Sequence, residues 1–257
     1  MAGRSSRIIQ CLLAILFLNP FAAYGVDGSL QSSRATSSLW TSDETTLTFG
    51  VLAGAAAFSL LDESIRHQVQ KNHSESAHDV ADGVALAGHA AVTLGLSGVL
   101  WGVGTWAGDE HLASTGVQAL EAIALGQVGC AMMKVTFGRK RPDPSEDAAF
   151  FKPFSLDDDF QSLPSSHTAS AFALASVLAK RSDTPYAPLG YYGLATLVGL
   201  ARIYQDEHWT SDVIVGALVG ELAGRLVVHW NEEKRQSVLI TPYAGDSVGF
   251  LVQIAWP

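Results

Sequence analysis

ARIYQDEHWTSD, residues 201–212, joins two apolar segments and carries three chemically active side chains at fixed spacing. The flanking segments, Tyr186–Ala201 and Ser211–Trp230, are rich in Ala, Leu and Gly and are longer than ordinary strands, so they predict helices. Arg202 is followed after five residues by His208 and after three more by Asp212. His208 and Asp212 therefore share one face if the second helix has already begun at that point.

Four more apolar segments of helical length precede this stretch, and together the six predict an all-α fold built on a six-helix bundle. These segments are Thr45–Leu61, Gly83–Gly108, about Leu112 to Lys134, and Thr168–Ala179. In the last helix, a row of glycines continues the face of Asp212 at four-residue intervals: Gly216, Gly220 and Gly224. We expect this row to let a neighbouring helix pack closely.

The two ends of the chain differ from this helical middle. Ser237–Tyr243 and Gly249–Trp256 alternate in polarity around a short turn and predict a C-terminal β-hairpin within a tail of residues 231–257. The first 25 residues have a basic start, an apolar stretch and a small-residue site, which predicts a signal peptide; an uncleaved anchor is the alternative. Since no linker or repeat divides residues 40–230, we expect one helical domain there.

The composition favours contact with lipid. Hydrophobic residues make up 48% of the chain and charged residues 16%, against roughly 25% charged in an ordinary soluble domain. Only Gly83–Gly108 comfortably exceeds the length of a membrane span, so a membrane bundle is favoured and a soluble helical bundle is the alternative. The net charge of −9 argues against a nucleic-acid partner. We expect an exported protein at the membrane of the bacterial cell envelope, with its active site facing the periplasm.

Two further motifs supply groups that suit an anionic substrate. KVTFGRKRP, residues 134–142, places Lys134 and Arg141 in a basic cluster, and PSSH, residues 164–167, immediately precedes an apolar helix. Lys134, Arg141 and Arg202 are the natural donors to phosphate oxygens, because phosphoryl transfer depends mainly on positioning and charge stabilisation. Ser165 and Ser166 are expected at a helix N-terminus, where backbone N–H groups bind anions.

The remaining polar side chains can carry the chemistry. In this interpretation His208 is the nucleophile that forms a phosphohistidine, Asp212 orients its ring, and His167 is the general acid and base. Asp206 and Glu207 immediately precede His208, where they can raise its pKa, repel an anionic substrate or simply point to solvent. The histidines elsewhere lack zinc-like spacing, so we expect no metal and no other cofactor.

In combination, the three motifs resemble those of the superfamily of type 2 phosphatidic acid phosphatases, bacterial non-specific acid phosphatases and vanadium haloperoxidases. The resemblance implies a six-helix core and these site residues: Lys134, Arg141, Ser165, Ser166, His167, Arg202, His208 and Asp212. Two positions depart from the family pattern. Ser166 replaces a glycine and adds a Cβ where close approach to phosphate is expected, and Ala201 replaces a serine and loses a hydroxyl.

The resemblance implies a metal-independent phosphatase for a phosphomonoester or diphosphate of a membrane lipid, with vanadate as an inhibitor that resembles the transition state. Implied substrates include phosphatidate, phosphatidylglycerophosphate, polyprenyl diphosphate and a lipid A phosphate. The alternatives are a soluble periplasmic acid phosphatase, a vanadium-dependent haloperoxidase, and a non-catalytic membrane protein that binds lipid headgroups. The sequence leaves the individual lipid and the oligomeric state open.

Overall fold

The computed structural model describes residues 42–143, 147–236, 238–244 and 248–254. The described helices are α2 (Ser42–Ser59), α3 (Asp62–Lys71), α4 (Glu75–Leu86), α5 (Ala90–Ala107), α6 (Glu110–Phe137), α7 (Ser166–Lys180), α8 (Ala187–Tyr204) and α9 (Thr210–Gln236), with a 3₁₀ turn, η2, at Asp158–Phe160. The prediction of an all-α fold is confirmed over the described residues from 42 to 236, and the six-helix core within it stays a prediction. The predicted signal peptide, residues 1–25, lies outside the described residues.

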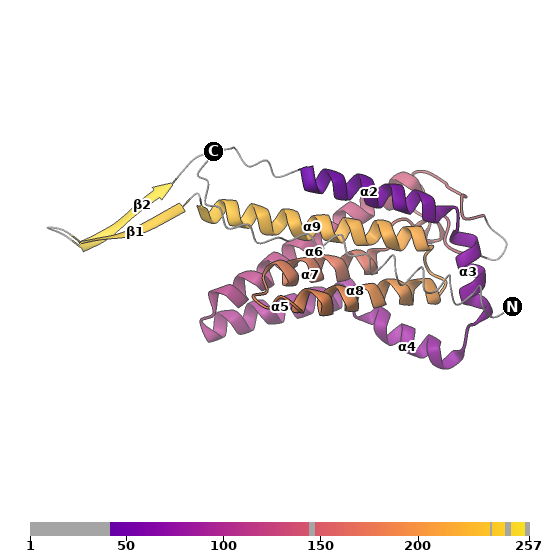
Figure 1. Cartoon of the computed structure of the whole chain (residues 1–257), viewed down its shortest axis with the longest axis horizontal. Coiled ribbons are helices and arrows are strands. Elements are labelled where there is room, and N and C mark those ends of the chain that lie inside the picture. The colour runs from indigo at the N-terminus through magenta and orange to yellow at the C-terminus, as the bar shows by residue number, and fades with distance from the viewer. Residues whose placement is uncertain (1–41, 144–146, 237, 245–247, 255–257) are drawn as a thin grey trace.

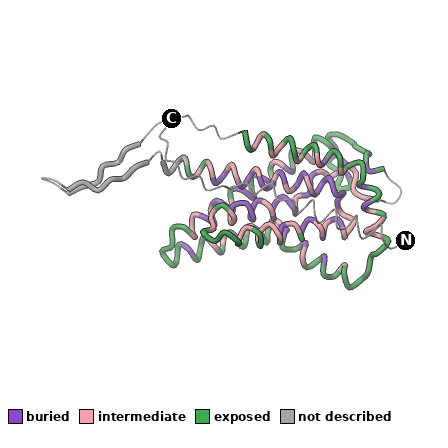
Figure 2. Tube along the Cα trace, viewed as in Figure 1, coloured by how far each residue is buried: buried purple, intermediate pink, exposed green. Residues whose placement is uncertain are grey.

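The long helices lie side by side along the long axis of the molecule, while α3 and α4 cover one of its ends (Figure 1). Helix α7 lies in the middle and packs against α6, α8 and α9. Its small side chains, among them Ala173 and Val177, are fully buried (Figure 2). A helix this short and this enclosed gives the bundle its core, because each neighbour buries an apolar stripe against it.

The glycine row on α9 explains how closely α9 approaches α7. A Cβ at Gly216 would lie 2.5 Å from the carbonyl oxygen of Ser165, and one at Gly220 would lie 2.2 Å from that of Ala169. At Gly224 the clash would be with Ser176. The prediction of close packing at this row is therefore confirmed.

One predicted helix was wrong. Gly83–Gly108 was expected to be continuous, but α4 ends at Leu86 and α5 begins at Ala90. His89 caps α5, since its Nδ1 accepts from the backbone N–H of Ala91 at 3.2 Å. A Cβ at Gly88 would lie 2.8 Å from the carbonyl oxygen of His167 in α7, so the break lets this segment pass close to the start of α7.

Among the described residues, three helical segments are long and apolar enough to cross a membrane: α5, α6 and residues Thr210–Glu232 of α9. The pair α2 and α3, bent by 63°, would add a fourth span if it counts as one. Helix α5 presents large apolar side chains outward, with Trp101 and Trp106 51% and 89% exposed. Such a surface suits lipid better than water. The protein is thus membrane-embedded. Within the predicted span Gly83–Gly108, only α5 is a candidate to cross the membrane.

Beyond α9, strands β1 (Val238–Ala244) and β2 (Val248–Ile254) pair antiparallel. Their register places Val238 opposite Ile254 and Ala244 opposite Val248. The predicted C-terminal hairpin overlaps these strands and stays a prediction, because parts of its range, residues 237, 245–247 and 255–256, lie outside the described residues.

Candidate active site

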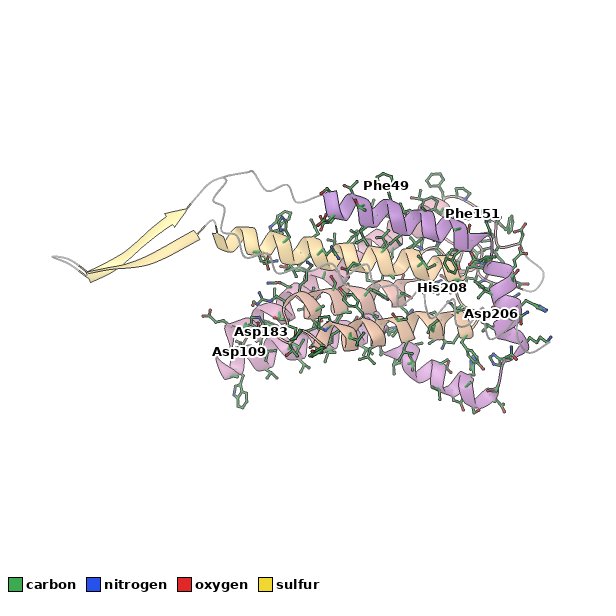
Figure 3. The ribbon with its side chains drawn as sticks, in the orientation of Figure 1. Phe49, Asp109, Phe151, Asp183, Asp206 and His208 are labelled. Atoms are coloured by element: carbon green, nitrogen blue, oxygen red, sulfur yellow. The ribbon has the colours of Figure 1, made fainter. Side chains whose placement is uncertain are left out.

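The three motifs meet at the end of the bundle that α3 and α4 cover, and Figure 3 labels His208 and Asp206 there. Helices α6 and α8 end at this place, and α7 and α9 begin there. Chain segments distant in sequence come together because consecutive helices run in opposite directions (Figure 1). All eight sequence-predicted site residues lie on these helix ends or in the loops between them.

The first motif spans the end of α6 and the chain that follows it. Gly138 caps the helix with φ 58°, and a Cβ there would lie 1.8 Å from the carbonyl oxygen of Lys152, so only glycine fits. Lys134 remains inside the last helical turn, where its Nζ donates to the carbonyl oxygen of Gln161. Arg139 and Arg141 follow in extended chain, and an isolated bridge pairs Arg139 with Phe151.

The second motif forms the start of α7, as predicted from its sequence. Ser165 is the N-cap, and its Oγ accepts from the backbone N–H of Thr168 at 3.5 Å and from the Thr168 hydroxyl at 2.9 Å. The Ser165 N–H donates to the carbonyl oxygen of Asp212 at 3.1 Å, which ties α7 to α9. Ser166 and His167 are the first two helical residues. They therefore stand at the positive end of the helix dipole.

His208 is buried, with 3% of its surface exposed, and its protonation pattern follows from one contact. Its Nδ1 lies 2.8 Å from the carbonyl oxygen of Ser162. Because a carbonyl oxygen can only accept, Nδ1 must carry the proton, which leaves the lone pair on Nε2. The ring is thus held in the tautomer that a nucleophilic histidine needs.

The predicted direct bond between Asp212 and His208 is absent. His208 precedes α9, which begins at Thr210, so the two residues do not occupy successive turns of one helix. The closest approach, from Nδ1 to Oδ2, is 3.9 Å, too long for a hydrogen bond. Asp212 instead accepts from the Ser162 hydroxyl at 2.6 Å and from the Trp209 N–H at 3.0 Å. It therefore positions His208 through Ser162, whose carbonyl oxygen holds the ring.

Arg139 is a site residue to which the sequence analysis gave no role beyond the basic cluster. It is buried, with 3% of its surface exposed, and one Nη donates to Asp212 Oδ1 at 2.6 Å and to Ser211 Oγ at 2.7 Å. The other Nη donates to Asp62 Oδ2 at 2.8 Å and to the Ala148 carbonyl oxygen at 2.8 Å. Asp62, at the start of α3, also accepts from the Ser211 N–H at 3.0 Å. No local pattern in the sequence pointed to Asp62.

Three cations surround His208, and we call Lys134, Arg141 and Arg202 the cation cluster. Arg141 Nη1 donates to the Glu207 carboxylate at 2.6 Å and to the Glu207 carbonyl oxygen at 3.1 Å. Arg202 donates to Gln205 Oε1 at 2.6 Å, and its other Nη lies 3.4 Å from the Glu207 carboxylate. Within the described residues the buried Nε of Arg202 has no hydrogen-bond partner.

The environment keeps both site histidines neutral at neutral pH. Burial lowers the pKa of His208 well below its ordinary 6.5, and the three members of the cation cluster lower it further. Burial also lowers the pKa of His167 to about 4, with contributions from Arg202 and from His89. The rings of His167 and His89 meet edge to face, with 5.5 Å between their centroids.

Metal ligands do not gather at this site. Among the residues that the structure describes, no three or more His, Cys, Asp or Glu side chains are arranged to hold a metal ion. The expectation of chemistry without a metal stays a prediction, because only an activity assay tests it.

Comparison with known proteins agrees with the motifs. A family model described as the PAP2 superfamily matches residues 115–236, which run from within α6 to the end of α9. The lipid A 1-phosphatase of Porphyromonas gingivalis is 41% identical over 95 residues, 36% of this chain and 18% of that protein. Those of Rhizobium johnstonii and Rhizobium etli are each 32% identical over 91 residues, 35% of this chain and 36% and 38% of those proteins. The chain thus spans less than two-fifths of each of these three relatives.

Two solved structures share the fold at 23% identity each. Aquifex aeolicus LpxE aligns over 66% of this chain and 95% of its own, with a TM-score of 0.54. The first transmembrane PAP2 type phosphatidylglycerolphosphate phosphatase from Bacillus subtilis aligns over 75% of this chain and 98% of its own, with a TM-score of 0.60. The motifs, the match of residues 115–236 to the family model and the shared fold all support the PAP2 superfamily for this chain.

Proposed function

We propose that the chain is a metal-independent phosphatase that removes a phosphate group from a membrane lipid, with the 1-phosphate of lipid A as the first candidate substrate. One observation carries the proposal: the Ser162 carbonyl oxygen holds the Nδ1 proton of buried His208, which leaves the Nε2 lone pair for attack beside the cation cluster. The similarity to three lipid A 1-phosphatases supports the choice of substrate class. The candidate membrane spans support a lipid over a small soluble ester.

The first chemical step transfers the phosphoryl group to the protein. His208 Nε2 attacks phosphorus while the bond from phosphorus to the ester oxygen breaks. The protonated form of His167, which is the minor form at neutral pH, donates its proton to the departing oxygen. The cation cluster stabilises the charge that spreads over the non-bridging oxygens. The N–H groups at the start of α7 add further donors, since helix N-termini favour anions.

The second step returns the protein to its starting state. His167, now neutral, takes a proton from a water molecule that attacks the phosphohistidine. The bond between Nε2 and phosphorus breaks, and orthophosphate is released. Asp212 and Ser162 keep Nδ1 protonated through both steps, so that the ring always presents Nε2 to phosphorus.

The direct test is phosphate release by purified protein in detergent. The substrates are lipid A 1-phosphate, phosphatidate, phosphatidylglycerophosphate, a polyprenyl diphosphate and a soluble aryl phosphate, all with EDTA present. We expect EDTA-resistant release that His208→Ala abolishes and that the matched change His111→Ala, at the exposed start of α6, leaves intact. Preference for the aryl phosphate would favour a soluble acid phosphatase, and release that EDTA removes would refute the metal-independent mechanism.

We also propose that the site faces the periplasm. Helices α2, α5 and α6 precede the site and run along the bundle (Figure 1), so three crossings require the chain to enter α2 from the cytoplasmic side. This topology agrees with the alternative of an uncleaved anchor and not with a cleaved signal peptide. Leu156 is 82% exposed in the loop beside the site, so a cysteine substituted there shows on which side of the membrane the site lies. An impermeant maleimide should label Leu156→Cys in cells with a permeabilised outer membrane. Labelling only after the inner membrane is broken would place the site in the cytoplasm.

A further inference from the structure

The two acidic residues before His208 have different partners, and one of them is turned into the site. Asp206 faces away and accepts from Arg66 Nε at 2.7 Å, which ties the loop to α3. Glu207 faces the cation cluster, where its Oε2 lies 2.6 Å from Arg141 Nη1 and 3.4 Å from Arg202 Nη2. A single carboxylate oxygen therefore bridges two arginines that come from different motifs.

This contact has the chemistry of a phosphate contact. Arginine recognises carboxylate and phosphate oxygens with the same N–H groups, so the two anions compete for the same donors. Glu207 immediately precedes His208, and its side chain is 44% exposed, so it can rotate into solvent when another anion arrives. Arg202 is more enclosed, with 12% of its side chain exposed, and stays in place.

We infer that Glu207 is an internal anion of the phosphate site: its carboxylate neutralises Arg141 and Arg202 when the site is empty, and substrate phosphate must displace it. The inference rests on the proposed function, because it assigns those two arginines to phosphate. Glu207 thereby weakens the binding of substrate and of orthophosphate product alike. In the empty site, the Glu207 carboxylate also serves as the counter-ion of two guanidinium groups that lie beside a buried histidine.

The alternative role of Glu207 predicts an effect of opposite sign. If the carboxylate acts as a clamp that holds the arginines in position for phosphate, its removal weakens phosphate binding. If it competes with phosphate, its removal strengthens binding. The sign of one measured change therefore decides between the two roles.

The experiment compares Glu207→Gln with Asp206→Asn, which removes the same charge from the adjacent residue without touching the cation cluster. Calorimetric titration of the detergent-purified full chain with orthophosphate gives the dissociation constant without any turnover. We expect Glu207→Gln to lower this constant about tenfold, the size expected for one or two partly exposed ion pairs. Asp206→Asn should change it by less than about threefold, since its charge is farther away and screened.

Two results would overturn the inference: an unchanged or weaker affinity in Glu207→Gln, or an equal gain in both variants, which would indicate a general charge effect. Kinetics add a second readout, because a competing anion raises KM and the inhibition constant of orthophosphate by the same factor. Failure here is distinct from failure of the proposed function. A wild type that hydrolyses lipid phosphate without any affinity gain in Glu207→Gln refutes the role of Glu207 alone.

Discussion

Replacing Arg139 with methionine should destabilise the protein strongly, although Arg139 is not among the groups proposed to touch phosphate. Its guanidinium pairs with Asp62 and Asp212, whose side chains are both fully buried. Removing one partner of a buried ion pair costs about 3–5 kcal/mol, because the remaining charge is left without compensation. Here two carboxylates lose the same partner, so we expect the upper part of this range, offset in part by the hydrogen bonds that Asp212 keeps from Ser162 and Trp209.

Thermal unfolding in detergent, followed by loss of the monodisperse peak on size-exclusion chromatography, measures this effect. A loss of this size corresponds to a fall in Tm of about 10 °C or more for a chain of this length. The matched control is Lys140→Met, because Lys140 is the next residue and its partner Asp159 is 66% exposed. An exposed pair contributes about 0–1 kcal/mol, so the control should melt close to wild type. An Arg139→Met protein that melts with the control would refute the structural role of the Asp62–Arg139–Asp212 contact.

Three further predictions concern packing, pH and inhibition. Gly220→Ala should lower the free energy of unfolding by about 1–3 kcal/mol, because its Cβ would lie 2.2 Å from the Ala169 carbonyl oxygen. The control is Gly193→Ala, whose Cβ would have no atom within 4 Å, so thermal unfolding should show it to be neutral or slightly stabilising. Because the pKa of His208 is lowered, its ring stays neutral and nucleophilic below pH 6.5, while the protonated fraction of His167 grows as the pH falls. We therefore expect kcat/KM to rise as the pH falls from 8 towards 5.5. A kcat/KM that rises with pH would contradict this. Orthovanadate should inhibit competitively against the lipid substrate and EDTA should not inhibit, whereas vanadate-dependent halide oxidation would indicate a haloperoxidase.

The sequence predicted the parts of the site that depend on local spacing. Each motif lies where an apolar helix begins or ends, and antiparallel helices joined by short loops bring such ends together. Ser165 was expected as a cap because a serine before an apolar run is the usual start of a helix, and it is the cap of α7. The close approach of a neighbouring helix was expected from the four-residue glycine spacing on α9, and the structure identifies Ser165 as the neighbour of Gly216.

The remaining features depend on contacts between distant segments. The break before α5 was not predicted, because no proline occurs among residues 87–89 to mark it. The break allows Gly88 to lie close to the start of α7. Asp62 was missed because its partner Arg139 lies 77 positions along the chain. The expectation that His208 and Asp212 share a helical face depended on the helix having begun at His208, and α9 begins only at Thr210.

The most direct test of the central claim is to trap the phosphorylated protein. Full-length protein in detergent is mixed for milliseconds with a lipid carrying radioactive phosphate, denatured in alkali and separated from lipid, with EDTA present throughout. We expect a protein-bound label that is stable to alkali, labile to acid, carried by His208 and absent from His208→Ala. Phosphate release without any labelled protein, or a label that persists in His208→Ala, would contradict the role of His208 as nucleophile.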